Sequence, residues 1–250
     1  MELAFEDLWQ TRATALAEMQ GILKAEAGIT ARIFTLTDEC LEDYQKFFLG
    51  KTPLATVSSV VTLKGRNLVL GCLTLMLDGL GQECGALFRL VLEAIELLRY
   101  VRVFPGAVDE ALEDRLPKAG EIAKRIDGKF KDLRDYLNEH ASHVAISFPA
   151  MRHLVDSSTG QLRIVQPHQA SVLSANLSTL FMFASMLALE SAATLAQCTY
   201  LTGEAPVTTE SLVNKIHMCR NEALHLFFPE EASAKKAGLV GLPLSGEPEI

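Results

Sequence analysis

The chain has 250 residues, of which 49% are apolar and 22% charged, and its net charge is −8. This is the composition of a soluble globular protein, with enough residues for one large domain or two small ones. The acidic balance argues against a surface that coats nucleic acid throughout, because phosphate contacts need Lys and Arg. The first ten residues, MELAFEDLWQ, lack the basic start of a secretory signal, so we expect none.

Gly and Pro divide the first 150 residues into predicted helices. Gly28 and Gly50 are placed to end two of them, and Pro105–Gly106 stops a third. A long helix after Pro117 carries a possible break near Gly128. The predicted helices span residues 1–27, 30–49, 68–80, 82–104, 108–115 and 118–144.

The later part of the chain contains the only hint of strand. Two short alternating runs flank Ser-Ser-Thr-Gly within residues 152–165, which predicts a β-hairpin. Helices are predicted over 168–201 and 209–228. Residues 170–189 carry no charge and are long enough to cross a bilayer. Because Ser, Thr and Asn interrupt them, we predict a buried core helix and no membrane partner.

Helices of this length with short connections pack as antiparallel bundles. The predicted fold is therefore all-α, an antiparallel helical bundle with a small β-hairpin insertion. We expect one domain over 1–228, made of N-terminal helices (1–50) and a core bundle (54–228). The remaining residues, 229–250, are rich in Gly and Pro and are predicted to be a loose tail.

The five cysteines are widely spaced and form no C-x-x-C pair. Free, mostly buried thiols in a reducing cytoplasm are the simplest interpretation. No Gly-rich phosphate loop, G-x-S-x-G elbow or zinc-spaced cluster occurs, so we expect no cofactor and no metal. Glu222 and His225 have the Glu-x-x-His spacing of di-iron bundles, but such sites need a second motif that this chain lacks.

One polar seam interrupts the apolar helix over 82–104. Arg89, Glu93, Glu96 and Tyr100 follow one another at spacings of four, three and four, so they share one helix face. On a solvated face, an Arg–Glu pair contributes only about 0.3–0.5 kcal/mol. In a bundle interior the same charges are costly unless paired. Our hypothesis is that Glu93 pairs with Arg89 in a mostly buried setting.

Two further stretches place an Arg ahead of histidines. In RDYLNEHASH, Arg134 and His140 lie on opposite borders of an apolar stripe, and His143 lies farther toward solvent. His140 is either a half-buried histidine bonded to a neighbour or an acid–base group near neutral pH. In the last predicted helix, Asn214, His217, Asn221 and His225 form a hydrogen-bonding face, with Arg220 beside it.

The stretch RNEALHLF resembles the R-N-x-x-x-H-x-aromatic signature of HEPN domains, an all-helical family that includes many bacterial ribonuclease toxins. Arg220, Asn221, His225 and Phe227 fit it position by position. Residues 68–201 also resemble the HEPN-like bacterial 5677 domain-of-unknown-function family. That family pairs an Arg-Glu helix with a later LS-x-aromatic-x-His stretch, whose equivalent here is His140 or His143.

The resemblance implies two functions. In ribonuclease members the Arg holds the scissile phosphate and the His moves protons, without a metal. Arg220 and His225 are five apart, so an ideal helix points them about 140° from each other. A composite site at a homodimer interface would bring two copies together, with the basic stretch 118–134 drawing in RNA. The leading expectation is a binding or assembly module for a protein partner or a second copy, in phage defence or a mobile element. The alternative is the metal-independent endoribonuclease.

Overall fold

The computed structural model describes residues 3–140, 155–156, 158–162, 169–204 and 209–229. About 81% of these residues are helical and no strand occurs among them, which confirms the predicted all-α class. A π-helical turn, η1, continues α2. The helical elements are α1 Leu3–Gln20, α2 Lys24–Asp43, η1 Tyr44–Phe48, α3 Pro53–Leu77, α4 Cys84–Val103, α5 Ala107–Leu112, α6 Ala119–Arg125, α7 Lys131–His140, α9 Ala170–Thr202 and α10 Thr209–Phe227.

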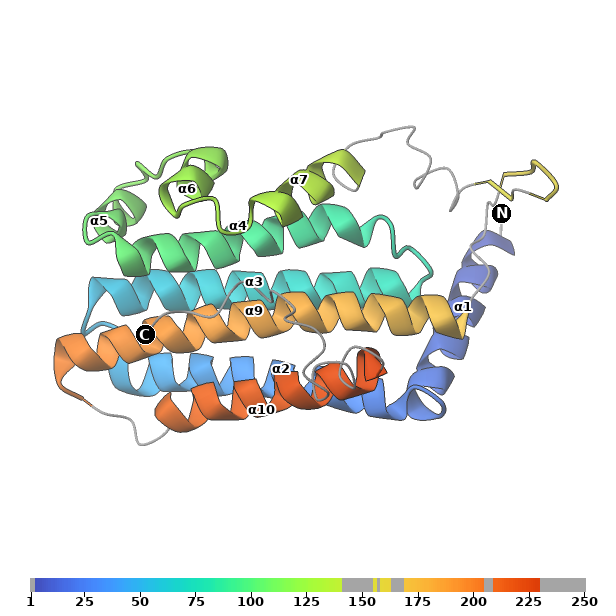
Figure 1. Ribbon diagram of the computed structural model, residues 1–250, viewed down its shortest axis with the longest axis horizontal. Helices are drawn as coiled ribbons and strands as arrows, with labels where there is room; N and C mark the ends of the chain where they lie inside the picture. The colour runs from blue at the N-terminus through green and yellow to red at the C-terminus, as the bar shows by residue number, and fades with distance from the viewer. Residues whose placement is uncertain (1–2, 141–154, 157, 163–168, 205–208, 230–250) are drawn as a thin grey trace, which may run out of the picture.

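Helix α9 lies at the centre of the bundle and packs against α2, α3, α4 and α10 (Figure 1). Helices α2 and α10 lie on one side of it, and the antiparallel pair α3–α4 lies on the other. The three short helices α5, α6 and α7 pack on α4, and α5 also packs on α3 (Figure 1). The bundle therefore has distinct outer surfaces on α10, on α3 and on the α5–α7 layer.

Local sequence explains the tight centre of this bundle. Thr52 caps α3 by accepting a hydrogen bond from the Ala55 backbone nitrogen at 3.0 Å, and Pro53 occupies the first turn. Gly65 allows α3 to approach α9, because a Cβ there would lie 2.8 Å from a methyl carbon of Leu187. Phe88 and Phe183 stack with ring centroids 4.4 Å apart and join α4 to α9.

The helix boundaries differ from the predicted ones at Gly28 and at the start of α3, which begins at Pro53 instead of residue 68. The chain turns at residues 21–23, and Gly28 lies inside α2 instead of ending a helix. The break predicted near Gly128 is present, because Asp127 and Gly128 take positive φ values of 61° and 60° and divide the predicted helix over 118–144. Its pieces are α6 and α7.

The predicted hairpin is not supported. Val155 and Leu162 form a single antiparallel bridge, and the Asp156 backbone nitrogen donates to Gln161 at 2.9 Å. Leu162 is 74% exposed, so its side chain packs on almost nothing. An isolated two-stranded ribbon needs such packing to persist. The rest of the predicted hairpin lies outside the described residues.

All five cysteines are buried and free, as the sequence predicts. Burial raises the pKa of Cys40 to about 12. Two described helices, α3 and α9, are long and apolar enough to cross a membrane, a property that core helices of soluble proteins share. Half of the apolar window of α9 is buried, but only 28% of that of α3. Helix α3 is thus apolar and less enclosed than α9.

Candidate functional site

The polar seam of α4 is the surface on which α7 packs. Arg134 of α7 donates from Nε to Oε1 of Glu96 at 3.3 Å, and its Nη2 atom binds the other carboxylate oxygen. A second ion pair joins Arg134 to Glu93 at 3.8 Å. Arg134 is 9% exposed and Glu96 only 1%. Burial raises the pKa of Glu96, and the hydrogen bond from Arg134 opposes that rise.

The seam is less buried at one end, at Arg89 and Glu93. At its other end, Tyr100 binds α5 and α6. Arg89 and Glu93 form the predicted ion pair at 3.3 Å, but their side chains are 34% and 27% exposed, so the setting is not mostly buried. The Tyr100 hydroxyl donates to Glu110 of α5 at 2.8 Å and accepts from Arg125 of α6 at 2.5 Å. The seam therefore anchors all three helices of the α5–α7 layer.

This arrangement changes the role expected for Arg134. Its guanidinium is paired with the buried Glu96 and the half-buried Glu93, so Arg134 fixes α7 on α4 and is not placed to hold a phosphate. His140 is the last residue of α7, and its side chain lies outside the described part of the structure. His143 lies outside the described residues as well.

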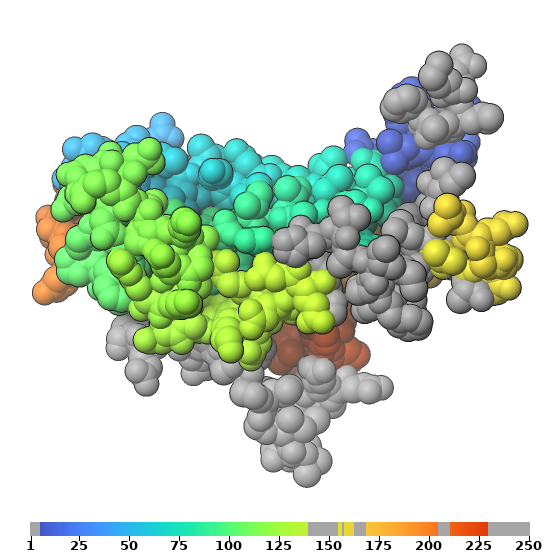
Figure 2. All heavy atoms as spheres, turned by 90° about the horizontal axis from the view of Figure 1, so that it is seen from above, coloured from blue at the N-terminus to red at the C-terminus, as the bar shows by residue number. Residues whose placement is uncertain are grey.

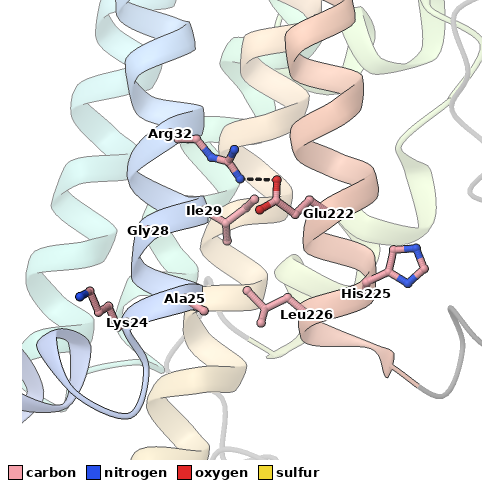
Figure 3. A pocket seen from close by; sticks show the side chains of 8 residues that line it. All are labelled: Lys24, Ala25, Gly28, Ile29, Arg32, Glu222, His225 and Leu226. Carbon is pink, nitrogen blue, oxygen red and sulfur yellow. Dashed lines mark hydrogen bonds and ion pairs between the residues drawn. The ribbon is translucent and has the colours of Figure 1, made fainter.

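The motif on α10 lies at the edge of a groove between α2 and α10. The groove has a volume of about 560 Å³ and is lined by Lys24, Ala25, Gly28, Ile29, Arg32, Glu222, His225 and Leu226. Arg32 and Glu222 form an ion pair across it, so Glu222 is engaged by a cation (Figure 3). The imidazole of His225 points away from the other lining side chains (Figure 3).

The other two motif residues do not join His225 in that groove. Arg220 is half-buried, Asn221 is exposed, and neither lines the groove. One copy of α10 therefore does not gather the three side chains around a common point, in agreement with the helical spacing. No group of three or more His, Cys, Asp or Glu that could hold a metal occurs among the described residues.

A second groove lies between α3 and α4. It has a volume of about 420 Å³ and is lined by Val60, Leu63, Lys64, Asn67, Leu68, Gly71 and Leu87. Val60 is 62% exposed, Leu63 49% and the neighbouring Leu90 43%. Figure 2 shows that the α5–α7 layer covers part of α4 and leaves α3 at the surface. We call the surface formed by these groove residues of α3 and by Leu87 of α4 the α3 face.

The outward residues of α3 repeat with the spacing of a coiled-coil seam. Val60, Leu63, Asn67, Leu70 and Thr74 follow at intervals of three and four. Asn67 is at the middle of this run, with one apolar residue a turn away on each side. Gly71 and Leu87 line the groove together, and Leu87 packs close to Gly71, because a Cβ there would lie only 3.1 Å from a Leu87 methyl carbon.

Sequence reasoning missed the α3 face. Its signal is visible: α3 contains no acidic residue and has apolar side chains on every side. A helix that is apolar all round is predicted to be buried. The sequence alone does not show which side of α3 has no other segment packed against it.

No protein-family model, no curated protein and no solved structure matches this chain. The HEPN resemblance therefore stays a prediction.

Proposed function

We propose that this protein is a HEPN-like helical assembly module that pairs with a second copy of itself through the α3 face. The observation that supports this is the exposed apolar seam of α3 together with the groove that it lines beside α4. Exposed apolar residues gathered beside a groove are typical of interaction surfaces.

Charge favours a second copy as the occupant. The chain has a net charge of −8, so two copies repel each other over most of their surface. Helix α3 has no acidic residue, and its only exposed charged side chain is Lys64. Two copies therefore meet with little like-charge contact when their α3 faces approach.

The shape of the α3 face also complements itself. In an antiparallel pair of α3 helices centred on Asn67, a residue n positions before Asn67 faces the residue n positions after it in the other copy. Leu63 of one copy then faces the groove at Gly71 of the other, and each Asn67 faces its equivalent. An Asn at the centre of such a seam fixes the register at some cost in stability.

The test is the oligomeric state of the full chain. We expect a dimer by analytical ultracentrifugation between about 1 and 200 µM, with a mass that depends on concentration. Asn67→Lys places like charges beside each other and beside Lys64 of the other copy, so this variant is expected to be monomeric. The matched control is Asn214→Lys, an exposed position on α10 with the same change in charge. A monomeric wild type, or two variants that behave alike, would contradict the proposal.

The ribonuclease alternative makes a different prediction. Helix α10 lies across α9 from α3, so a dimer formed through α3 holds the two RNEALHLF motifs apart and does not build their composite site (Figure 1). His225 is nevertheless exposed at the rim of a groove. RNA cleavage in EDTA by the wild type, lost in His225→Ala, would favour the endoribonuclease. A dimer that Asn67→Lys leaves intact would favour it too.

A further inference from the structure

The groove between α2 and α10 combines an apolar lining with charged side chains at its edge. Ala25 and Ile29 of α2 and Leu226 of α10 supply the apolar part, and Leu226 points from α10 toward α2 (Figure 3). The side chains of Arg32 and Glu222 are 56% and 59% exposed, so their ion pair lies at the surface and leaves the groove open. With a volume of about 560 Å³, the groove has room for several side chains of another segment.

Gly28 widens this groove. It lies in the second turn of α2, and a Cβ there would meet no atom within 4 Å. Gly destabilises the interior of a helix relative to Ala, so the packing of the described residues gains nothing from the missing side chain. What the Gly does provide is room for the backbone of another segment to come close to α2.

The chain that follows α10 starts beside the groove. The described part of this region ends at Pro229, three residues after Leu226, and residues 230–250 come next in the sequence. They contain one apolar run, LVGLPL at 239–244, with four branched aliphatic side chains in six residues. Removing such side chains from water is favourable, so this run is a candidate occupant of a nearby apolar groove.

The length of the segment suits the groove. Residues 230–238 can extend to about 30 Å, which is enough for the chain to turn back after Pro229. From Lys24 to Arg32 the groove follows α2 for about 12 Å, at about 1.5 Å per residue. Four extended residues cover about 13 Å, and Pro243 favours an extended backbone at the residue before it.

Charge and lining chemistry favour this occupant over nucleic acid. Lys24 and Arg32 stand against one carboxylate in the groove, that of Glu222. The residues after the apolar run carry two negative charges, Glu247 and Glu249, and no cation. Single-stranded nucleic acid is held by aromatic side chains that stack on its bases, and the lining residues that the structure describes include no Phe, Tyr or Trp.

We propose that the groove between α2 and α10 binds the apolar run 239–244 of the same chain, with the backbone of the run passing over Gly28. Because the run is tethered to α10, its effective concentration at the groove is in the millimolar range, and a weak contact is enough to keep it bound. The proposal is independent of pairing through the α3 face, since the two surfaces lie on different helices. A bound run closes the groove to apolar segments of other proteins.

The first test is proteolysis of the full chain by thermolysin, which cuts beside accessible aliphatic residues. Gly28→Leu fills the groove and is expected to speed cleavage within 239–244 at least about fivefold. Gly120→Leu is the matched control, because Gly120 is an exposed helical glycine of α6 where a Cβ also meets no atom within 4 Å. It is expected to leave the cleavage rate, followed by mass spectrometry, unchanged.

The second test changes the run and observes the groove. Leu242→Asp places a charge in the apolar run, and it is expected to shift the backbone amide NMR signals of Gly28 and Ile29 in the full chain. Ala234→Asp adds the same charge outside the run and is expected to shift neither signal. This test does not depend on any substitution in the folded bundle.

Three outcomes would overturn the proposal. If wild type and Gly28→Leu are cleaved at the same rate, or if the α2 signals ignore Leu242→Asp, the groove does not hold this run and is left for a partner outside the chain. If cleavage of the wild type speeds up on dilution, the run of one copy binds the groove of another. Protection that is independent of protein concentration and is lost in Gly28→Leu alone supports docking within one copy.

Discussion

The α3–α4 pair has two unlike outer sides. The seam of α4 is charged, yet Glu96 is 1% exposed and its partner Arg134 9%. The outer side of α3 is apolar, yet Val60 is 62% exposed and Leu63 49%. On this pair, polarity alone does not tell which residues face solvent. A residue of this pair is buried where another segment packs over it with complementary side chains, and exposed where none does.

The cover of the α4 seam comes from the same chain. Helices α5, α6 and α7 bring Glu110, Arg125 and Arg134 to the seam, each as the partner of a polar residue on α4. Among the described residues, no helix is placed over the outward seam of α3 in the same way. The first surface is thus complete within one copy, and the second is open to another.

The largest effect is expected at the buried pair. Arg134→Ala leaves Glu96 as a buried carboxylate without its cation, which costs about 3–5 kcal/mol in the free energy of unfolding. Chemical denaturation of the variant and the wild type measures this directly. Because Arg134 supplies the ion pairs that join α7 to α4, the variant is also expected to expose α7 to proteolysis.

A matched arginine separates pairing from bulk. Arg125→Ala removes an arginine of the same layer whose side chain is 49% exposed, and it is expected to cost less than about 1 kcal/mol. If the two variants lose the same stability, the seam is not organised around the Glu96–Arg134 pair.

A smaller effect is expected at Glu93. Its pair with Arg89 is only half-buried, with side chains 27% and 34% exposed. Glu93→Ala is therefore expected to cost about 0.2–1 kcal/mol, much less than a buried pair. Urea denaturation at pH 7 tests this, and a loss above about 3 kcal/mol would mean that Glu93 shares the buried role of Glu96.

The raised pKa of Glu96 gives a pH dependence of known sign. A carboxyl group whose pKa is higher in the folded state than in the unfolded state favours folding below the unfolded value, about 4.3 for Glu. That contribution is lost as the pH rises through the folded pKa. Relative to Glu96→Gln, the wild type is therefore expected to lose stability as the pH rises from about 4 toward 7. A wild type that gains stability over this range would reverse the assignment.

The sequence predicted the seam and the all-α bundle because both depend on local spacing. The positions of Arg89, Glu93, Glu96 and Tyr100 follow from helical periodicity alone. The partner of Glu96 does not, because Arg134 lies 38 positions later and reaches it only after the chain turns at Gly128.

The same limit applies to the apolar helices. The sequence predicts nearly all of α9 but only the second half of α3, and only packing tells which one is central. The RNEALHLF motif of α10 can be identified in the sequence. The outward direction of the His225 side chain cannot, because it depends on how α10 packs against α2.

The smallest effect is expected at Val60, and it tests the other side of the comparison. Val60 is 62% exposed, and Ala is the better helix former, so Val60→Ala is expected to change the stability of the monomer by no more than about 0.5 kcal/mol. In a dimer formed through the α3 face, the same change removes two buried methyl groups from each copy. The melting temperatures of variant and wild type should therefore coincide in dilute solution and separate as the protein concentration rises. Curves that stay together at every concentration would show that Val60 faces solvent permanently and that the α3 face has no second copy against it.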